Sequence, residues 1–260
     1  MSETFTVAAG DTTLHGTDTP GGAPALLFIN GGFATQRHWR PVLRQLGGRY
    51  RTVTFDGRAR GRSGRSSDYS LRGALGDVGR VIEARGLERP VLVGWSHGAT
   101  LAVRYASEHP GEVSGLVLID GAYPIATFDE AGKERVRRQF RRLGPLMRVL
   151  ALLGLSARMT PAESAEVVIE MDTVNGGLAA DYAALRCPAA FVVASGAHSG
   201  STVEENARMR AAVTTATAAG ERVTVRATAP GNHVQVLAKD AGLVAGVIEG
   251  IVEDAVEGSV

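Results

Sequence analysis

The sequence predicts an α/β fold, a mostly parallel, doubly wound sheet with helices on both faces. Short apolar runs that end near Gly, Asn or Asp recur along the chain, as strands buried on both faces of a parallel sheet do. Segments with helical periodicity separate most of these runs. One long stretch without a strand interrupts this alternation, and it predicts an insertion into the sheet.

The expected elements follow in chain order. The residues up to about Thr17 are predicted to form a hairpin at the sheet edge. The predicted buried strands cover residues 24–29, 50–55, 91–93, 116–119, 191–194 and 223–227, and the last of them is shorter and more polar than the others. A helix is predicted where Leu71, Leu75, Val78 and Ile82 fall on one face. Further helices are expected over residues 38–46, 99–108 and 243–252.

The stretch without strands divides the chain. We expect residues 1–122 and 187–260 to form the core, and residues 123–186 to form a helical cap. Within the cap, residues 134–153 have a basic amphipathic pattern, which we expect to break near Gly144 and Pro145. Its arginines could contact an anionic substrate or a lipid surface, although such a run is more often a solvated face.

Composition limits the partners and the compartment. The chain has 28 basic and 27 acidic residues, so no global field attracts nucleic acid or an anionic membrane, and we expect neither partner. The single cysteine, Cys187, forms no internal disulfide and is predicted to be a small buried residue rather than a nucleophile. The sequence has no signal-peptide pattern and no apolar run long enough for a bilayer, which predicts a cytoplasmic protein. The oligomeric state stays open.

The strongest motif is Gly94-Trp95-Ser96-His97-Gly98. A predicted strand leads into this G-x-S-x-G pattern and a predicted helix follows it, which is the strand-turn-helix setting of a nucleophile elbow. The sharp turn raises the Ser96 hydroxyl above the carboxyl ends of the strands, where α/β folds bind ligands. The start of the helix supplies free N–H groups for developing negative charge.

Together with three other motifs, this elbow resembles the α/β-hydrolase superfamily over nearly the whole chain. Residues 30–33, Asn-Gly-Gly-Phe, with Trp39, are similar to its oxyanion loop. Residues 56–64 resemble its Asp-x-x-Gly-x-Gly-x-Ser turn, and residues 231–233, Gly-Asn-His, resemble its catalytic histidine loop. Asn30 replaces the commoner His, as in enol-lactone hydrolases that this chain resembles. The resemblance implies the α/β-hydrolase fold with a small cap.

The resemblance also implies site roles. Of the six histidines, His233 occupies the family's general-base position, after the serine in chain order. The oxyanion hole is expected to use the backbone N–H groups of Gly32 and His97. Phe33, Trp39 and Trp95 are candidates for lining the substrate pocket, although each could equally be a core residue.

The third member of the triad is missing from its usual place. The family carries this acid after the seventh strand, where residues 195–201 contain no carboxylate, and Glu204 and Glu205 follow at an expected helix start. Asp120 ends the sixth strand, and some members of the superfamily carry the acid there. We therefore predict Asp120 as the acid that orients His233. Asp56 and a dyad without an acid are the alternatives.

The sequence thus predicts a serine hydrolase of small carboxylic esters or lactones, acting through an acyl-enzyme on Ser96. The alternatives are a biosynthetic tailoring enzyme for cyclisation or acyl transfer, and a non-catalytic binding protein. Dehalogenase and epoxide-hydrolase chemistry is disfavoured because it needs an aspartate at the elbow. The scattered histidines have no metal-ligand spacing, and residues 58–65 lack the Gly-Lys-Ser/Thr of a phosphate loop, so we expect no cofactor.

Overall fold

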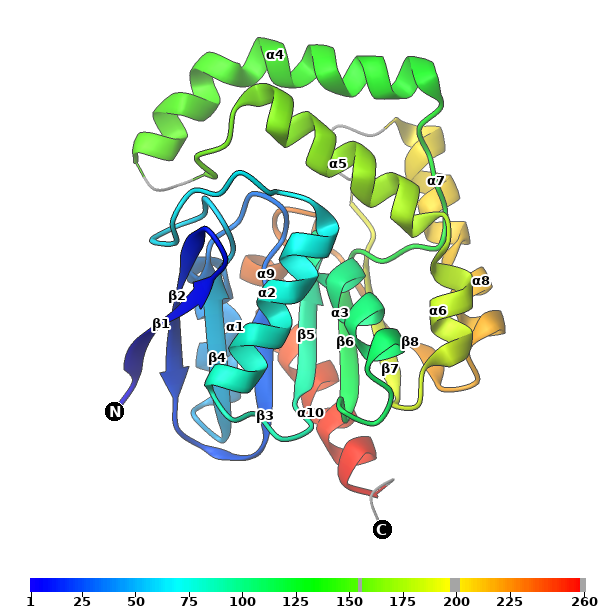
Figure 1. Ribbon diagram of the computed structural model, residues 1–260. Helices are drawn as coiled ribbons and strands as arrows, with labels where there is room; N and C mark the ends of the chain where they lie inside the picture. Colours follow the sequence, from blue (N-terminus) through cyan, green and yellow to red (C-terminus); the bar gives the residue numbers. More distant parts are fainter. Residues whose placement is uncertain (154–155, 197–201, 258–260) are drawn as a thin grey trace.

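The computed structural model describes residues 1–153, 156–196 and 202–257. In this part of the chain, eight strands form one sheet with the order β1-β2-β4-β3-β5-β6-β7-β8 (Figure 1). The strands are β1 (Glu3–Ala9), β2 (Thr12–Thr19), β3 (Gly22–Ile29), β4 (Tyr50–Asp56), β5 (Val91–Trp95), β6 (Gly115–Ile119), β7 (Ala189–Ala194) and β8 (Val223–Ala229).

The sheet is parallel except at one edge. Strands β1 and β2 form an antiparallel hairpin, and β2 also pairs antiparallel with β4. Every other neighbouring pair is parallel. Each residue of β5, β6 and β7 is buried, which explains why these strands appear in the sequence as apolar runs without alternation. The predicted parallel sheet and its edge hairpin are confirmed.

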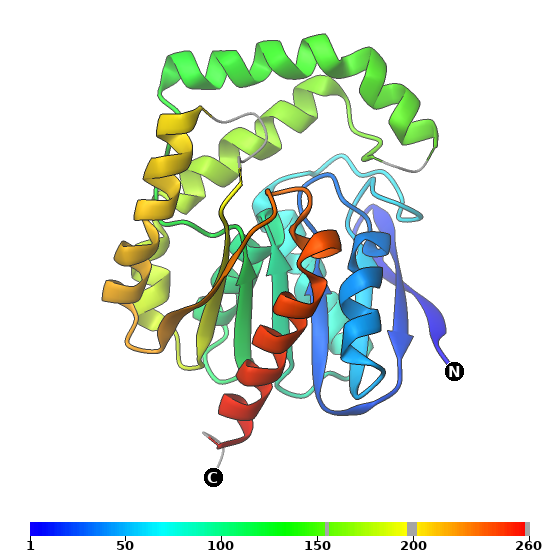
Figure 2. The ribbon, with the colours of Figure 1, turned by 180° about the vertical axis from the view of Figure 1, so that it is seen from behind.

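Helices cover both faces of this sheet. They are η1 (Gln36–Trp39), α1 (Arg40–Leu46), α2 (Leu71–Ala84), α3 (His97–Glu108), α4 (Glu130–Leu152), α5 (Pro161–Asn175), α6 (Leu178–Ala184), α7 (Val203–Ala211), α8 (Val213–Ala219), α9 (Val236–Lys239) and α10 (Ala241–Glu257). One buried cluster joins the sheet to α2, α3, α6 and α8, and a second joins its other face to α1, α9 and α10 (Figures 1 and 2). The site therefore stands on a sheet that is covered on both sides.

The predicted insertion between β6 and β7 contains α4, α5 and α6. Helices α4 and α5 lie against one another above the carboxyl ends of the strands, whereas α6 lies lower, beside α3 and α8 (Figure 1). No strand occurs among the described residues of this insertion. The exact division into core and cap stays a prediction.

Helix α4 runs without interruption through Gly144 and Pro145, so the expected break is wrong. A proline costs one helix hydrogen bond, and Arg141, whose carbonyl loses that bond, is exposed to water.

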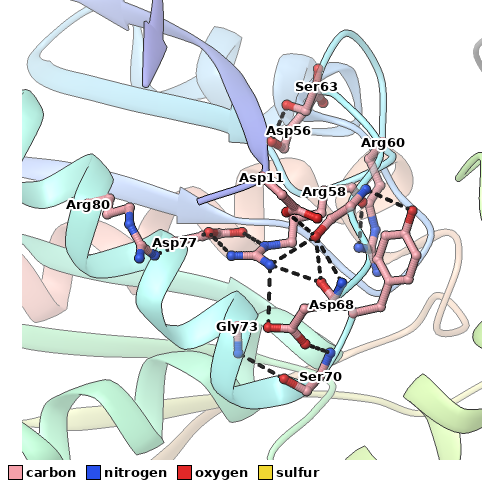
Figure 3. A network of polar contacts seen from close by, with 12 residues as sticks. Asp11, Asp56, Arg58, Arg60, Ser63, Asp68, Ser70, Gly73, Asp77 and Arg80 are labelled. Carbon is pink, nitrogen blue, oxygen red and sulfur yellow. Dashed lines mark hydrogen bonds and ion pairs between the residues drawn. The ribbon is translucent and has the colours of Figure 1, made fainter. Parts of the chain in front are cut away.

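The turn after β4 is held by buried charges. Arg58 donates to both carboxylate oxygens of Asp77, over 2.8 and 2.9 Å, and to the Asp68 carbonyl over 2.9 Å (Figure 3). The Asp77 carboxylate raises the pKa of Arg58 above its ordinary value. Asp56 accepts hydrogen bonds from the Gln36 and Arg62 backbone N–H groups. These contacts fix the loop that runs beneath the candidate site.

Candidate active site

Ser96 lies in a strained turn between β5 and α3. Its φ of 56° and ψ of −119° are rare for a residue with a side chain. The flanking glycines are required by close backbone contacts: a Cβ on Gly94 would lie 2.3 Å from the Gly98 oxygen, and one on Gly98 would lie 2.1 Å from the Ile29 oxygen. The turn thus has the geometry of a nucleophile elbow, with Ser96 on the wall of a cavity.

Two predicted partners meet at that cavity. Nδ1 of His233, in the loop between β8 and α9, lies 2.7 Å from Oδ2 of Asp120, directly after β6. Both residues are buried, and both line the cavity together with Ser96. The end of β6 also approaches the elbow closely, since a Cβ on Gly121 would lie 2.4 Å from the Ser96 oxygen. The strand order therefore brings all three residues to one place.

Tyr123 holds the carboxylate of Asp120 in position, and sequence reasoning missed it. Its hydroxyl donates to Oδ1 of Asp120 over 2.5 Å, and the backbone N–H of Ala194 donates to the same oxygen over 3.2 Å. Burial and the neighbouring carboxylate raise the pKa of Tyr123 well above its ordinary value, so its hydroxyl stays a donor. These two donors leave Oδ2 to face His233.

The other candidate acids lie elsewhere. Asp56 is engaged in the turn after β4, as described above. Glu205 caps α7 through Thr202 and pairs with Arg135 of α4, and Glu204 lies exposed beside it in the first turn of α7. Residues 197–201, including His198, lie outside the described residues. Among the described carboxylates, Asp120 is the one in contact with the His233 ring.

The expected oxyanion donors are adjacent. His97 is the first residue of α3, and a Cβ on Gly32 would lie 3.8 Å from the Cβ of His97. The Gly31 carbonyl accepts from the Ala34 N–H over 3.1 Å, and because a trans peptide points its N–H opposite to its C=O, this bond sets the direction of the Gly32 N–H. Both residues line the cavity.

Arg60 anchors this loop from below, which sequence reasoning also missed. Its guanidinium donates to the Gly32 carbonyl from Nε over 2.8 Å, and again from Nη2, while Nη1 donates to the Arg58 carbonyl over 2.7 Å. Burial lowers the pKa of Arg60 to about 10. The loop is thus tied to a buried cation.

Burial, with a smaller effect from Arg60, lowers the pKa of His97 to about 3, so His97 stays neutral.

The cavity above Ser96 has a volume of about 460 Å³. Most of its walls are apolar and come from the oxyanion loop and the insertion, including Phe33, Phe128, Phe140, Leu150, Val167 and Met171. No described lining residue is Lys or Arg. The arginines of α4 therefore do not reach this cavity.

The predicted pocket residues separate into two groups. Phe33 and Trp95 line the cavity, and the Trp95 indole N–H donates to the His233 carbonyl over 3.2 Å. Trp39 does not line it, which differs from the expectation. Its ring is fully buried against Phe28 on the sheet, and its N–H donates to Oδ1 of Asn30 over 2.7 Å. Trp39 is a core residue because its only polar atom already has a partner beneath the loop.

Comparison with known proteins identifies the fold. A family model for the alpha/beta hydrolase fold matches residues 24–144, which include the elbow and the oxyanion loop. The chain has the α/β-hydrolase fold. The enol-lactonase from Burkholderia xenovorans LB400 is similar in structure, with a TM-score of 0.70, 16% identity, and coverage of 94% of this chain and 98% of that one.

Curated relatives match only part of the chain. Epoxide hydrolase 3 from Xenopus tropicalis is 34% identical over 41% of this chain and 30% of its own length. The putative carbamate hydrolase RutD from Escherichia coli O150:H5 (strain SE15) is 30% identical over 40% of each chain. The chain thus spans well under half the length of these relatives in each alignment.

Proposed function

We propose that this α/β-hydrolase is a serine hydrolase that cleaves a carboxylic ester or lactone of a small molecule through an acyl-enzyme on Ser96. The observation that carries the proposal is the 2.7 Å contact between Nδ1 of His233 and Oδ2 of Asp120, in the cavity that Ser96 also lines. A carboxylate at Nδ1 holds the proton there and leaves Nε2 free to accept one. This is the state that a general base requires.

The chemistry follows from these positions. Oγ of Ser96 attacks the ester carbonyl carbon while Nε2 of His233 takes its proton. The carbonyl oxygen becomes an oxyanion, which accepts hydrogen bonds from the N–H groups of Gly32 and His97. The intermediate collapses, and His233 gives its proton to the departing alcohol. Water then repeats the sequence on the acyl-enzyme and releases the acid.

The cavity walls define the substrate more closely. An anionic substrate would lose its hydration there without meeting a Lys or Arg among the described lining residues, which is costly. The carboxylate of Asp172, also on the wall, is already bonded to the N–H groups of Thr127 and Phe128. We therefore assign a neutral substrate with an apolar acyl group.

The predicted cytoplasmic location stays a prediction.

One reason for the alternative, a tailoring enzyme for cyclisation or acyl transfer, was the arginine-rich insertion. Since its arginines lie away from the cavity, that reason no longer favours the alternative. The relative named epoxide hydrolase suggests a third chemistry, but the elbow residue here is Ser96 rather than an aspartate.

A series of p-nitrophenyl esters tests the proposal. We expect kcat/KM to rise from the acetyl to the octanoyl ester. The hemisuccinate ester, whose acyl group carries a negative charge, should have a much lower kcat/KM than an uncharged ester of similar size. Ser96→Ala should abolish turnover. Ser114→Ala is the matched control, because Ser114 is a buried serine before β6, at the opposite end of the sheet, and this variant should keep full activity. Turnover that survives in Ser96→Ala would overturn the proposal.

A further inference from the structure

Helix α4 carries an unusual outer surface over its second half. Of the ten exposed large apolar residues in the described part of the chain, five lie between residues 143 and 153. They are Leu143, Leu146, Val149, Leu152 and Leu153, and Leu152 is 88% exposed. Exposed arginines, Arg138, Arg142 and Arg148, lie among them. These eight residues are called the α4 surface below.

The α4 surface belongs to a segment of one charge. Residues 135–162 contain seven arginines and no Asp or Glu. Arg135, Arg137 and Arg141 pair with Glu205, Glu166 and Glu134. Arg142 and Arg148 form no ion pair within the described residues, and Arg138 reaches Glu134 only at 4.0 Å. The exposed apolar side chains thus lie among cations, of which Arg142 and Arg148 have no ion-pair partner in the described part of the chain.

The position of this surface leaves it accessible. Helix α4 is the outermost layer of the molecule, with α5 beneath it (Figure 1). The inner side of the same helix lines the cavity through Val136, Phe140 and Leu150. The helix therefore separates the apolar cavity from the surroundings by a single layer.

We propose that the α4 surface docks on an anionic phospholipid membrane. An interfacial helix of this kind places apolar side chains among the acyl chains and its arginines against the headgroups. A second copy fits the surface less well, because a symmetric contact would place arginines against arginines. The expectation of no membrane partner was based on the net charge of the whole chain. A net charge near zero is compatible with a local cluster of arginines on one surface. No helix in the described part could itself span a bilayer.

Sedimentation with lipid vesicles tests the docking. The protein should bind vesicles of equal parts phosphatidylglycerol and phosphatidylcholine, and bind phosphatidylcholine vesicles far more weakly. Arg142→Gln with Arg148→Gln, and separately Leu146→Ser with Val149→Ser, should each lower the partition coefficient roughly tenfold or more. All four positions are exposed, so melting temperature and turnover of a soluble ester should not change.

Matched controls lie at the other end of the molecule. Arg89→Gln with Arg222→Gln changes two exposed arginines just before β5 and β8, and Val225→Ser with Val256→Ser changes two exposed valines. Both should bind vesicles like the wild type, and so should Ser96→Ala, which separates docking from hydrolysis. Equal losses in the control and α4 variants would overturn the proposal. So would a dimer that dissociates in the α4 variants while vesicles are not bound, because a second copy would then cover the surface.

Discussion

Nδ1 of His233 lies 2.7 Å from Oδ2 of Asp120, although 113 positions separate the two residues in the chain. Strand β6 neighbours β5, which leads into the Ser96 turn, and a carboxylate at the end of β6 therefore lies beside the proposed nucleophile. Residues 195–201, after β7, contain no carboxylate. The contact with the His233 ring is thus made from the end of β6 rather than from the end of β7, where the resemblance would place the acid.

Asp120→Asn should lower kcat by roughly 10³ to 10⁴ with little change in KM. The amide no longer holds the Nδ1 proton, so the imidazole loses the tautomer that accepts the serine proton. Steady-state kinetics on the preferred ester measure the loss. Asp56→Asn is the control, because Asp56 supports a turn. This variant should be less stable than the wild type, but its kcat should stay close to the wild-type value at a temperature where it is folded. Equal kcat in Asp120→Asn and the wild type would remove Asp120 from the triad.

Tyr123→Phe removes one donor from Asp120 and leaves the ring in the core. We expect kcat to fall roughly tenfold, because a hydrogen bond to a charged carboxylate is lost and the carboxylate can turn away from His233. The KM should stay close to that of the wild type. Kinetics of Tyr123→Phe, with melting temperature measured in parallel, test this. An unchanged kcat would show that the Tyr123 hydroxyl is not needed to orient Asp120.

Arg60→Met removes the anchor of the oxyanion loop. Without the bonds to the Gly32 carbonyl, the peptide between Gly32 and Phe33 loses its anchor and the oxyanion loop can shift, so we expect kcat to fall about tenfold to a hundredfold. Binding of a boronic-acid analogue of the tetrahedral intermediate should weaken by a similar factor, while KM changes little. Arg60→Lys should recover part of the loss. Arg62→Gln, an exposed neighbour, should resemble the wild type. Equal weakening of substrate and analogue would instead indicate general damage to the pocket.

The buried imidazole of His97 should make stability fall with acid. Its folded-state pKa is about 3, below the ordinary value of 6.5, so the unfolded chain binds more protons between these values. Stability is therefore lost as pH falls from about 6.5 towards 3. By about pH 4.5 this one group should cost about 3 kcal/mol. Urea unfolding at neutral pH and at that acidic pH should show a smaller drop for His97→Gln than for the wild type. Equal drops would mean that His97 is protonated in the folded state.

Local sequence patterns predicted most of the fold and part of the site. The buried strands, the turn around Ser96 and the loop of His233 depend on residues close in sequence, and Asp120 could be proposed as the acid because it ends a strand. Tyr123 and Arg60 were missed because their contacts appear only after folding: Arg60 reaches a carbonyl 28 positions away. An arginine in a glycine-rich turn ordinarily points to solvent. Trp39 illustrates the same limit, since an aromatic residue beside an oxyanion loop can face either the pocket or the core.

The most direct test of the central claim is covalent labelling of Ser96. Intact-mass spectrometry after treatment with a fluorophosphonate carrying an alkyl chain should show one adduct, and peptide mapping should locate it on Ser96. Labelling should be absent in Ser96→Ala, much slower in His233→Ala, and unaffected in Ser114→Ala. An adduct on another residue, or no adduct in a folded wild-type protein, would contradict the assignment of Ser96 as the nucleophile.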